Sequence, residues 1–378
     1  MRVFILQLAI ILLASKLAGS LSVKLGQPSV LGKLLVGIVL GPSVLGLINE
    51  TETLEEFSKI GVILLMFAAG LETDIDEFKR AGKASAYVGF GGMIVPFVFS
   101  YIVGIMLHFT TMQALFLGLL LSATSVSISV QALKELKQLK TREGTTILGA
   151  AVIDDVVIIV ALAFLMSFTD GDVHLTTVIL KKALFFIGTI LVGWKVVPWF
   201  LKKVTRLNVT ETLLTSALII CFVFAYFAEY TGIAAIIGAY IAGVSINITS
   251  FKNEVFKKVE TISYSIFVPV FFTSIGISAQ FAGITHYLDL IAILSVLAIV
   301  TKLAGSGIGA KLAGFSWHSS LGIGSAMIPC GEVALIMAAI GLDSNLLTQE
   351  MFAVIVAVIF VTTIATLPLM KLSFKSNM

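Results

Sequence analysis

The stretch GAAVIDDVVIIVALAFL, residues 149–165, decides the fold, because Asp154 and Asp155 alone interrupt its apolar character. With the apolar residues that flank it, this stretch reaches the roughly 20 residues that a helix needs to cross a bilayer. Carboxylates in the middle of such a span are costly in hydrocarbon, so each requires a partner or a water-filled cavity. The stretch therefore predicts a membrane helix that carries a polar site inside the bilayer.

The rest of the chain has the same character. Of its 378 residues, 58% are hydrophobic and 12% are charged, whereas a soluble domain has about 25% charged residues. This composition excludes a soluble enzyme, a nucleic-acid-binding protein and a disordered chain. Because backbone groups in lipid need partners within helices, we predict an all-α polytopic membrane protein. We expect about thirteen spans, near residues 3–22, 30–48, 57–71, 84–107, 112–133, 144–168, 174–200, 211–228, 232–248, 260–279, 284–312, 319–341 and 348–370.

The basic residues gather in alternate connections between these spans. Lys137 and Lys202 belong to basic connections, while Glu50 and Asp170 lie in the acidic turns between them. Positively charged connections stay in the cytoplasm, so we expect a multi-pass protein of the cell membrane with its N-terminus outside and its C-terminus inside. Lysines near span ends, Lys33 among them, are expected to reach the interface.

Three places hold ionisable residues that lie too deep in their predicted spans for the side chain to reach the membrane interface. Asp154 and Asp155 are adjacent on one helix, and their side chains point about 100° apart. Lys302 lies inside the eleventh span, where an isolated ammonium needs a carboxylate partner, and either aspartate is a candidate. Glu332 follows Pro329 and Gly331, a combination that indicates a broken helix.

The fifth span carries a second irregularity, with Ser122, Thr124 and Ser125 close together. An intact helix whose hydroxyls bond to its own carbonyls is one interpretation. The other is a break matching the one in the twelfth span, which makes spans 2–6 and 9–13 two inverted five-helix repeats with crossed broken helices. Such paired breaks indicate a binding site at the membrane midplane of a secondary transporter. Hydroxyl and carboxylate oxygens there favour a small cation.

These segments resemble those of a known family. The matching pieces are VLGKLLVGIVLGPSVLGL (30–47), ILLMFAAGLETD (63–74), SATSVSIS (122–129), GAAVIDDVV (149–157), the region of Lys302, and PCGEVALI (329–336). The chain resembles bacterial monovalent cation:proton antiporters of the NapA, GerN and NhaA kind, which are related to the Kef potassium-efflux systems. The resemblance extends from about residue 25 to about residue 340.

The resemblance implies an NhaA-like fold and a role for each unusual residue. Asp155 corresponds to the carboxylate that carries either Na⁺ or H⁺, and Asp154 to the residue that pairs with Lys302. The implied cation and proton site consists of Asp154, Asp155, Thr124 and Ser125, with Lys302 and Glu332 as charge partners. Asp155, Asp154 and Thr124 are the implied ligands of the transported Na⁺.

The resemblance also implies a domain organisation and partners. Residues 1–78 and 206–280 correspond to a dimerisation domain, residues 79–170 and 281–378 to a core ion-translocation domain, and residues 171–205 to a linker helix. The implied assembly is a homodimer in the lipid bilayer, with no cofactor and no nucleic acid, and with Na⁺ and H⁺ as cargo.

Two departures from the family pattern bear on function. Many relatives have an arginine where this chain has Cys330, so Glu332 and Glu72 lose the partner that the resemblance implies. Kef-type proteins carry Gln-Asp in place of Asp154-Asp155 and a cytoplasmic nucleotide-binding domain, and this chain ends at Met378. We therefore expect an electrogenic Na⁺/H⁺ antiporter working by alternating access, with Li⁺ or K⁺ as other cations.

Other functions remain as alternatives. A K⁺/H⁺ antiporter, a Kef-like potassium-efflux protein or a channel has the same architecture, as does an ion-coupled transporter of organic solutes. An intramembrane aspartyl protease is disfavoured, because that chemistry needs two carboxylates that share a proton, and Asp154 and Asp155 are neighbours on one helix.

Overall fold

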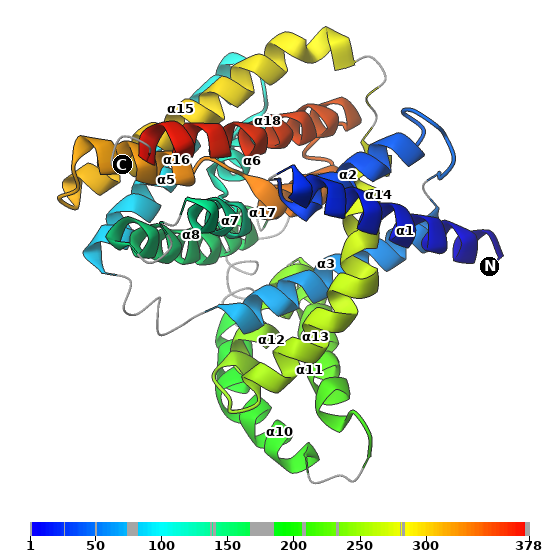
Figure 1. Cartoon of the computed structure of the whole chain (residues 1–378). Coiled ribbons are helices and arrows are strands. Elements are labelled where there is room, and N and C mark those ends of the chain that lie inside the picture. The colour runs from blue at the N-terminus through cyan, green and yellow to red at the C-terminus, as the bar shows by residue number, and fades with distance from the viewer. Residues whose placement is uncertain are drawn as a thin grey trace. The chain divides into compact units, whose positions relative to one another are not determined.

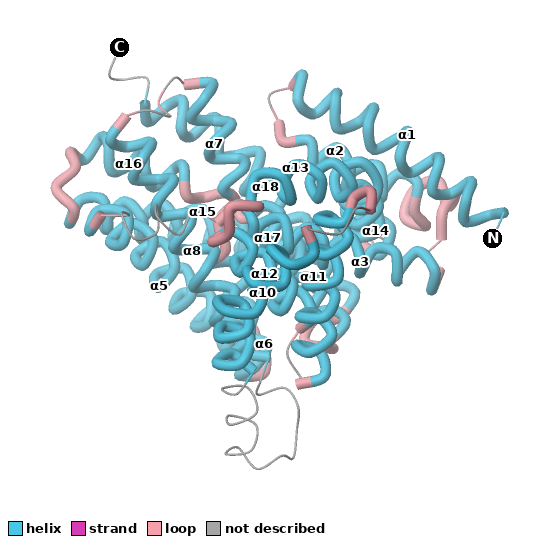
Figure 2. The backbone as a smooth tube through the Cα atoms, turned by 90° about the horizontal axis from the view of Figure 1, so that it is seen from below, coloured by secondary structure: helices cyan, strands magenta, loops and turns pink. Residues whose placement is uncertain are grey.

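The computed structural model describes residues 2–25, 27–49, 51–73, 82–136, 138, 141–166, 185–205, 209–231, 234–279, 281 and 284–374. All regular structure within these residues is helical (Figure 2). Eight of the described helices are long and apolar enough to cross a membrane. The predicted all-α class with membrane-spanning helices is thereby confirmed, whereas the count of thirteen spans stays a prediction. The predicted span at 174–200 lies partly outside the described residues.

The chain divides into two compact units, and each is assembled from separate segments (Figure 1). Unit 1 comprises Met1–Lys16, Glu50–Thr73 and Ala163–Ser274, and unit 2 comprises Leu17–Asn49, Asp74–Leu162 and Ile275–Met378. The domain boundaries predicted from the sequence also alternate along the chain. Residues 17–49 cluster with unit 2 in the structure, and the predicted division into dimerisation domain, core domain and linker stays a prediction.

Unit 1 is a helical bundle in which α3 packs against α12. Its helices are the first part of α1 (Arg2–Lys24), α3 (Glu52–Glu72), the helix Phe185–Val204 that includes η1 (Val192–Val196) and α10 (Val197–Val204), α11 (Thr212–Tyr230), α12 (Ala235–Asn247), α13 (Lys252–Ile262), η2 (Ser263–Phe267) and most of α14 (Val268–Ser278). At the end of α12, Asn247 Nδ2 donates hydrogen bonds to the carbonyls of Leu71 (2.6 Å) and Thr73 (2.8 Å). These bonds satisfy carbonyls at the C-terminal end of α3, where the helix leaves its own acceptors unpaired.

Unit 2 is organised around the crossing of its two long helices α5 and α15. Its helices are α2 (Ser29–Leu40), α5 (Lys83–Met106), α6 (Thr111–Ser122), α7 (Val126–Glu135), most of α8 (Arg142–Met166), η3 (Ile284–Tyr287), α15 (Leu288–Leu312), α16 (Trp317–Ala326), α17 (Gly331–Asp343) and α18 (Gln349–Phe374). A Cβ at Gly91 would lie 2.4 Å from the carbonyl oxygen of Gly305, and a Cβ at Gly305 would lie 2.2 Å from that of Gly91. Glycine at both positions therefore allows the two backbones to touch.

The second helix is shorter than expected. A span was predicted over 30–48, but α2 ends at Leu40, and Gly41 is extended (φ −73°, ψ 179°). Pro42 explains the end, because a residue before proline avoids the helical conformation. Twelve residues rise only about 18 Å. Lys33 on this helix is 7% exposed, so its side chain is enclosed by protein instead of lying on the surface as expected.

Candidate functional site

Two helices of unit 2 are interrupted where the sequence is irregular. The first break lies between α6, which ends at Ser122, and α7, which begins at Val126. The second lies between the end of α16 at Ala326 and the start of α17 at Gly331. Gly331 has φ +59°, a backbone conformation that glycine adopts without strain. The interpretation of the fifth span as one intact helix is therefore wrong.

The two breaks are hydrogen-bonded to each other. Ser125 N–H donates to the carbonyl of Pro329 (2.6 Å), and Thr124 Oγ1 donates to that of Met327 (3.5 Å). Ser129, one turn into α7, donates its hydroxyl to the carbonyl of Ala326 (2.5 Å). Non-helical backbone at membrane depth persists only where protein or a cavity satisfies its polar groups. Each break thus supplies hydrogen-bond partners for the other.

Lys302 of α15 reaches the first break. Its side chain is fully buried, and its Nζ donates to the carbonyl of Ser122 and to the hydroxyl of Thr124. The same Nζ lies 3.6 Å from Oδ2 of Asp154. The Ser122 carbonyl is at the C-terminal end of α6, where unpaired carbonyls give a helix its partial negative charge. The ammonium is therefore surrounded by a helix end, a hydroxyl and a carboxylate.

The two adjacent aspartates of α8 have different surroundings. Asp154 is 1% exposed, and within the described residues neither of its carboxylate oxygens accepts a hydrogen bond. Its neighbours are Lys302 and Thr124, with which it interacts electrostatically. Asp155 is only half-buried, and its side chain leaves the helix about 100° from that of Asp154. The carboxylate facing Lys302 is therefore fixed in protein, and the next one is more accessible.

The remaining predicted residues lie at the breaks. Thr124 and Ser125 are both buried in the first break. Glu332 is in the first turn of α17, but its side chain lies outside the described part of the structure. Cys330, buried in the second break, interacts electrostatically with Lys302 and Asp154.

Sequence reasoning missed one neighbour of Lys302, the carbonyl of Ser122. The position of Ser122 just before the irregular segment was the available signal for it. Cys330, which the sequence shows only in place of an arginine, is buried in the second break.

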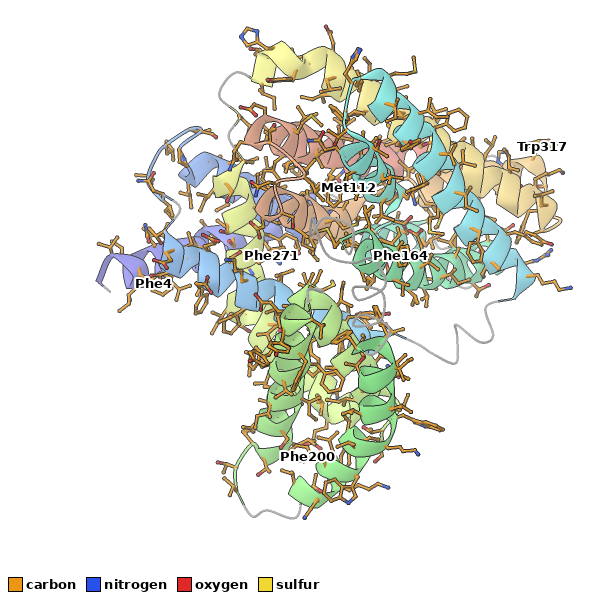
Figure 3. All side chains as sticks on the ribbon, turned by 180° about the vertical axis from the view of Figure 1, so that it is seen from behind. Phe4, Met112, Phe164, Phe200, Phe271 and Trp317 are labelled. Carbon is orange, nitrogen blue, oxygen red and sulfur yellow. The ribbon has the colours of Figure 1, made fainter. Side chains whose placement is uncertain are left out.

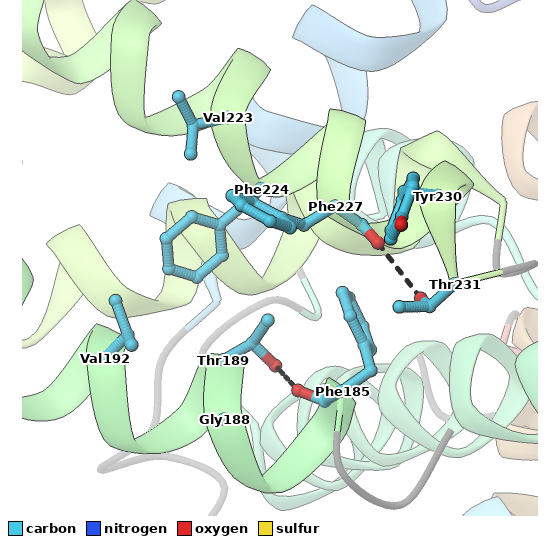
Figure 4. A pocket seen from close by; sticks show the side chains of 9 residues that line it. All are labelled: Phe185, Gly188, Thr189, Val192, Val223, Phe224, Phe227, Tyr230 and Thr231. Carbon is cyan, nitrogen blue, oxygen red and sulfur yellow. Dashed lines mark hydrogen bonds between the residues drawn. The ribbon is translucent and has the colours of Figure 1, made fainter. Parts of the chain in front are cut away.

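Unit 1 contains a cavity of different chemistry. It has a volume of about 760 Å³ and is lined mainly by aromatic and aliphatic side chains of α11 and the helix Phe185–Val204 (Figure 4). Thr189 and Thr231 also line it, and each donates its hydroxyl to a backbone carbonyl of its own helix. The described residues of its lining include no carboxylate and no cation, so this lining does not fit an ion-binding site.

Comparison with known proteins gives consistent results. A family model described as "Sodium/hydrogen exchanger, transmembrane" matches residues 9–371. The chain is 55% identical to a probable Na⁺/H⁺ antiporter, GerT, of Bacillus cereus over 98% of this chain and 99% of the relative. It is also 55% identical to the Na⁺/H⁺-K⁺ antiporter GerN of the same organism, over 99% and 97% of the two chains. Its fold is similar to that of the sodium proton antiporter MjNhaP1 of Methanocaldococcus jannaschii, with a TM-score of 0.71, 17% identity, and coverage of 99% and 97%.

Proposed function

This chain belongs to the sodium/hydrogen exchanger family, and on that premise we propose that it exchanges Na⁺ for H⁺ across the cell membrane as an electrogenic secondary antiporter. The names of its two 55% identical relatives support this function. We further propose that it is a homodimer that needs no cofactor, with its N-terminus outside and its C-terminus in the cytoplasm. The charge bias of the connections supports this orientation.

Asp155 is the proposed carboxylate that Na⁺ and H⁺ share. The observation that carries this assignment is the difference between the two aspartates. Asp154 is buried against Lys302, while Asp155, the next residue of α8, is half-buried. A carboxylate that exchanges ions with water has to be accessible to water, and the half-buried Asp155 meets this requirement. Charge at mid-membrane also has to be compensated, and Asp154 meets that requirement through its buried ion pair with Lys302.

Alternating access follows from the charge on this site. With a proton on Asp155, or with Na⁺ held at the carboxylates, the negative charge of Asp155 is compensated within the site, so the site crosses from one side of the membrane to the other at a lower electrostatic cost than when it is empty. With neither bound, movement would carry an uncompensated charge through a medium of low dielectric constant. Because a bound Na⁺ excludes the proton and the empty site does not cross, Na⁺ released on one side has to be replaced by a proton from that same side before the site returns, which is exchange.

Lys302 accounts for the proposed electrogenicity. Na⁺ binding draws Asp154 toward the cation and away from Lys302, which then releases its proton. When Na⁺ leaves, Lys302 takes up a proton and pairs with Asp154 again, at the 3.6 Å separation seen here. One proton on Asp155 and one on Lys302 then exchange for one Na⁺, so each cycle moves net charge.

The decisive test replaces Asp155 by asparagine. In proteoliposomes with an entrapped pH indicator, we expect Asp155→Asn to abolish Na⁺-dependent proton movement, because an amide neither titrates nor compensates Na⁺. Asp289→Asn is the matched control, since Asp289 is an exposed carboxylate in the first turn of α15, and it should retain full exchange. Full activity of Asp155→Asn would overturn the assignment.

A K⁺/H⁺ antiporter is the second candidate, and the naming of K⁺ for the relative GerN favours testing it. The same vesicles are therefore given Na⁺, K⁺ and Li⁺ separately at imposed voltages. We expect proton movement with Na⁺. Proton movement with K⁺ alone would assign the chain to K⁺/H⁺ exchange, and K⁺ flux without proton movement would assign it to an efflux pathway or a channel.

A further inference from the structure

A groove runs along the outside of unit 2 where α5 crosses α15. Its volume is about 590 Å³, within the range of small-molecule sites. The two helices are antiparallel there, because Gly91 meets Gly305 while a Cβ at Gly309 would lie 2.1 Å from the carbonyl of Tyr87. Glycines line the groove on both helices, so it owes part of its depth to missing side chains.

The walls of the groove are apolar and exposed. Phe90 (45% exposed) and Ile94 (53%) of α5 lie opposite Ile308 (54%) and Leu312 (70%) of α15. Both helices are candidate membrane spans, so these side chains contact hydrocarbon in a bilayer. A groove of this kind, when it faces lipid, is filled by an acyl chain, because water has no polar partners along these walls.

One end of the groove is positively charged. Lys83, the first residue of α5, is exposed and lines the groove. Among the described residues no side chain caps the N-terminus of α5, and its first turn has no acidic residue, so the positive end of the helix dipole adds to the attraction for an anion. Tyr87 follows one turn later and is 49% exposed.

The neighbouring end of α15 adds a second cation and an interfacial aromatic residue. Lys311 Nζ lies 5.1 Å from the ring centroid of Trp317, and Trp317 is 68% exposed and projects outward at the start of α16 (Figure 3). Tryptophan and lysine together are typical of the level of the lipid headgroups. The apolar groove thus begins at headgroup level and continues into the hydrocarbon.

We propose that this groove binds one anionic phospholipid, with its phosphate at Lys83 and an acyl chain along the α5–α15 crossing. The lipid belongs to the cytoplasmic leaflet, an assignment that rests on the orientation given under the proposed function, whereas the binding itself does not. The bound chain contacts α15 at Gly305, one turn from Lys302. The lipid is therefore placed to stabilise the helix crossing that holds the buried lysine in position.

The test measures lipid binding to the purified full chain by native mass spectrometry. Phosphatidylglycerol, phosphatidylcholine with the same acyl chains, and sn-glycerol 3-phosphate are titrated separately. We expect the first phosphatidylglycerol to bind at least fivefold more tightly than phosphatidylcholine, about the factor that one lysine contributes near an anionic surface, and glycerol phosphate not to bind. Equal affinity for the two lipids, or saturation by glycerol phosphate, would overturn the proposal.

Two matched pairs of variants locate the site. Lys83→Gln should weaken phosphatidylglycerol binding about fivefold, whereas Lys202→Gln, an exposed lysine in the last turn of α10, should leave it unchanged. Ile308→Trp fills the groove and should weaken both lipids, whereas Val300→Trp, at an equally exposed position of α15 (55%), should not.

An equal effect of Lys83→Gln and Lys202→Gln would mean nonspecific attraction and overturn the site. Unchanged lipid binding by Ile308→Trp would overturn the position of the acyl chain. If Ile308→Trp lost self-association of the protein and kept its lipid binding, the groove would be assigned to a second copy of the chain. Because no transport is measured, a chain that binds lipid but fails to exchange ions refutes only the proposed function.

Discussion

Replacing Lys302 by methionine removes the ammonium from the buried pair while keeping a side chain of similar length. Both members of the pair have side chains that are 0% exposed, and their charged atoms lie 3.6 Å apart. Removal of one partner of a buried pair destabilises a protein by about 3–5 kcal/mol, because it leaves an uncompensated charge. We expect a loss of this size for Lys302→Met, and a similar one for Asp154→Asn.

The double variant separates the charge effect from the other contacts. Asp154→Asn with Lys302→Met leaves no charge unpaired, and only the lost hydrogen bonds to Ser122 and Thr124 remain, which are worth about 1–3 kcal/mol. The sum of the two single losses is about 6–10 kcal/mol. The double variant should therefore recover at least about 3 kcal/mol relative to additivity.

The assay is unfolding of the detergent-solubilised protein by sodium dodecyl sulfate, followed by circular dichroism. Lys258→Met is the control, since Lys258 pairs with Glu211 at 2.9 Å, a shorter distance, but at the surface. Exposed pairs contribute little, so this variant should unfold with the wild type. Additive losses in the double variant, or an equal loss in the Lys258 variant, would refute the reasoning that burial and not distance sets the magnitude.

Three further predictions concern the breaks, the helix crossing and the transported charge. Gly331→Ala should destabilise the protein by more than about 3 kcal/mol, since its Cβ would lie 2.1 Å from that of Ser125. Gly46→Ala is the control, because Gly46 has φ +60° and a Cβ there would have no described atom within 4 Å; it should lose only the roughly 1–2 kcal/mol of left-handed backbone. Equal midpoints of thermal unfolding for the two variants would contradict this. Gly305→Ala should lower the midpoint of thermal unfolding, because its Cβ would lie 2.2 Å from the Gly91 carbonyl. Gly307→Ala, whose nearest contact would be 3.4 Å, should instead gain up to about 1 kcal/mol of helix propensity. A gain in stability in both variants would show that α5 and α15 do not pack closely at Gly305. In proteoliposomes, any exchange that Lys302→Met retains should no longer respond to membrane voltage, and a persistent voltage response would remove Lys302 from the proton count.

Parts of this fold follow from the sequence alone. Apolar length predicts the long helices, because a span has to cover the hydrocarbon. The early end of α2 was missed, although Pro42 signals it, because hydropathy continues past the proline to Leu47. Length of an apolar run indicates where a chain is buried, but local backbone chemistry decides where a helix stops.

At the candidate site, too, the sequence predicts only part of where the helices stop. The second break has Pro329 and Gly331, so its sequence predicts it. The first break has neither residue type between Ser122 and Val126; instead, Ser125 N–H bonds to the Pro329 carbonyl of the other break. The Ser/Thr cluster marks an irregularity there but is equally compatible with an intact helix, because the hydrogen bond that stabilises the break joins segments distant in the chain. For the same reason the sequence left both aspartates as partners for Lys302.

The mutual hydrogen bonding of the two breaks has a consequence for biosynthesis. Thr124 and its acceptor Met327 are separated by 203 positions, and a ribosome adding about 5–20 residues per second needs roughly 10–40 s to make that distance. During that interval the first half of the chain enters the membrane while the polar backbone groups of the first break lack their hydrogen-bond partners in the second break. The insertion machinery, or water next to that machinery, has to supply hydrogen-bond partners for these groups until the second half of the chain is synthesised.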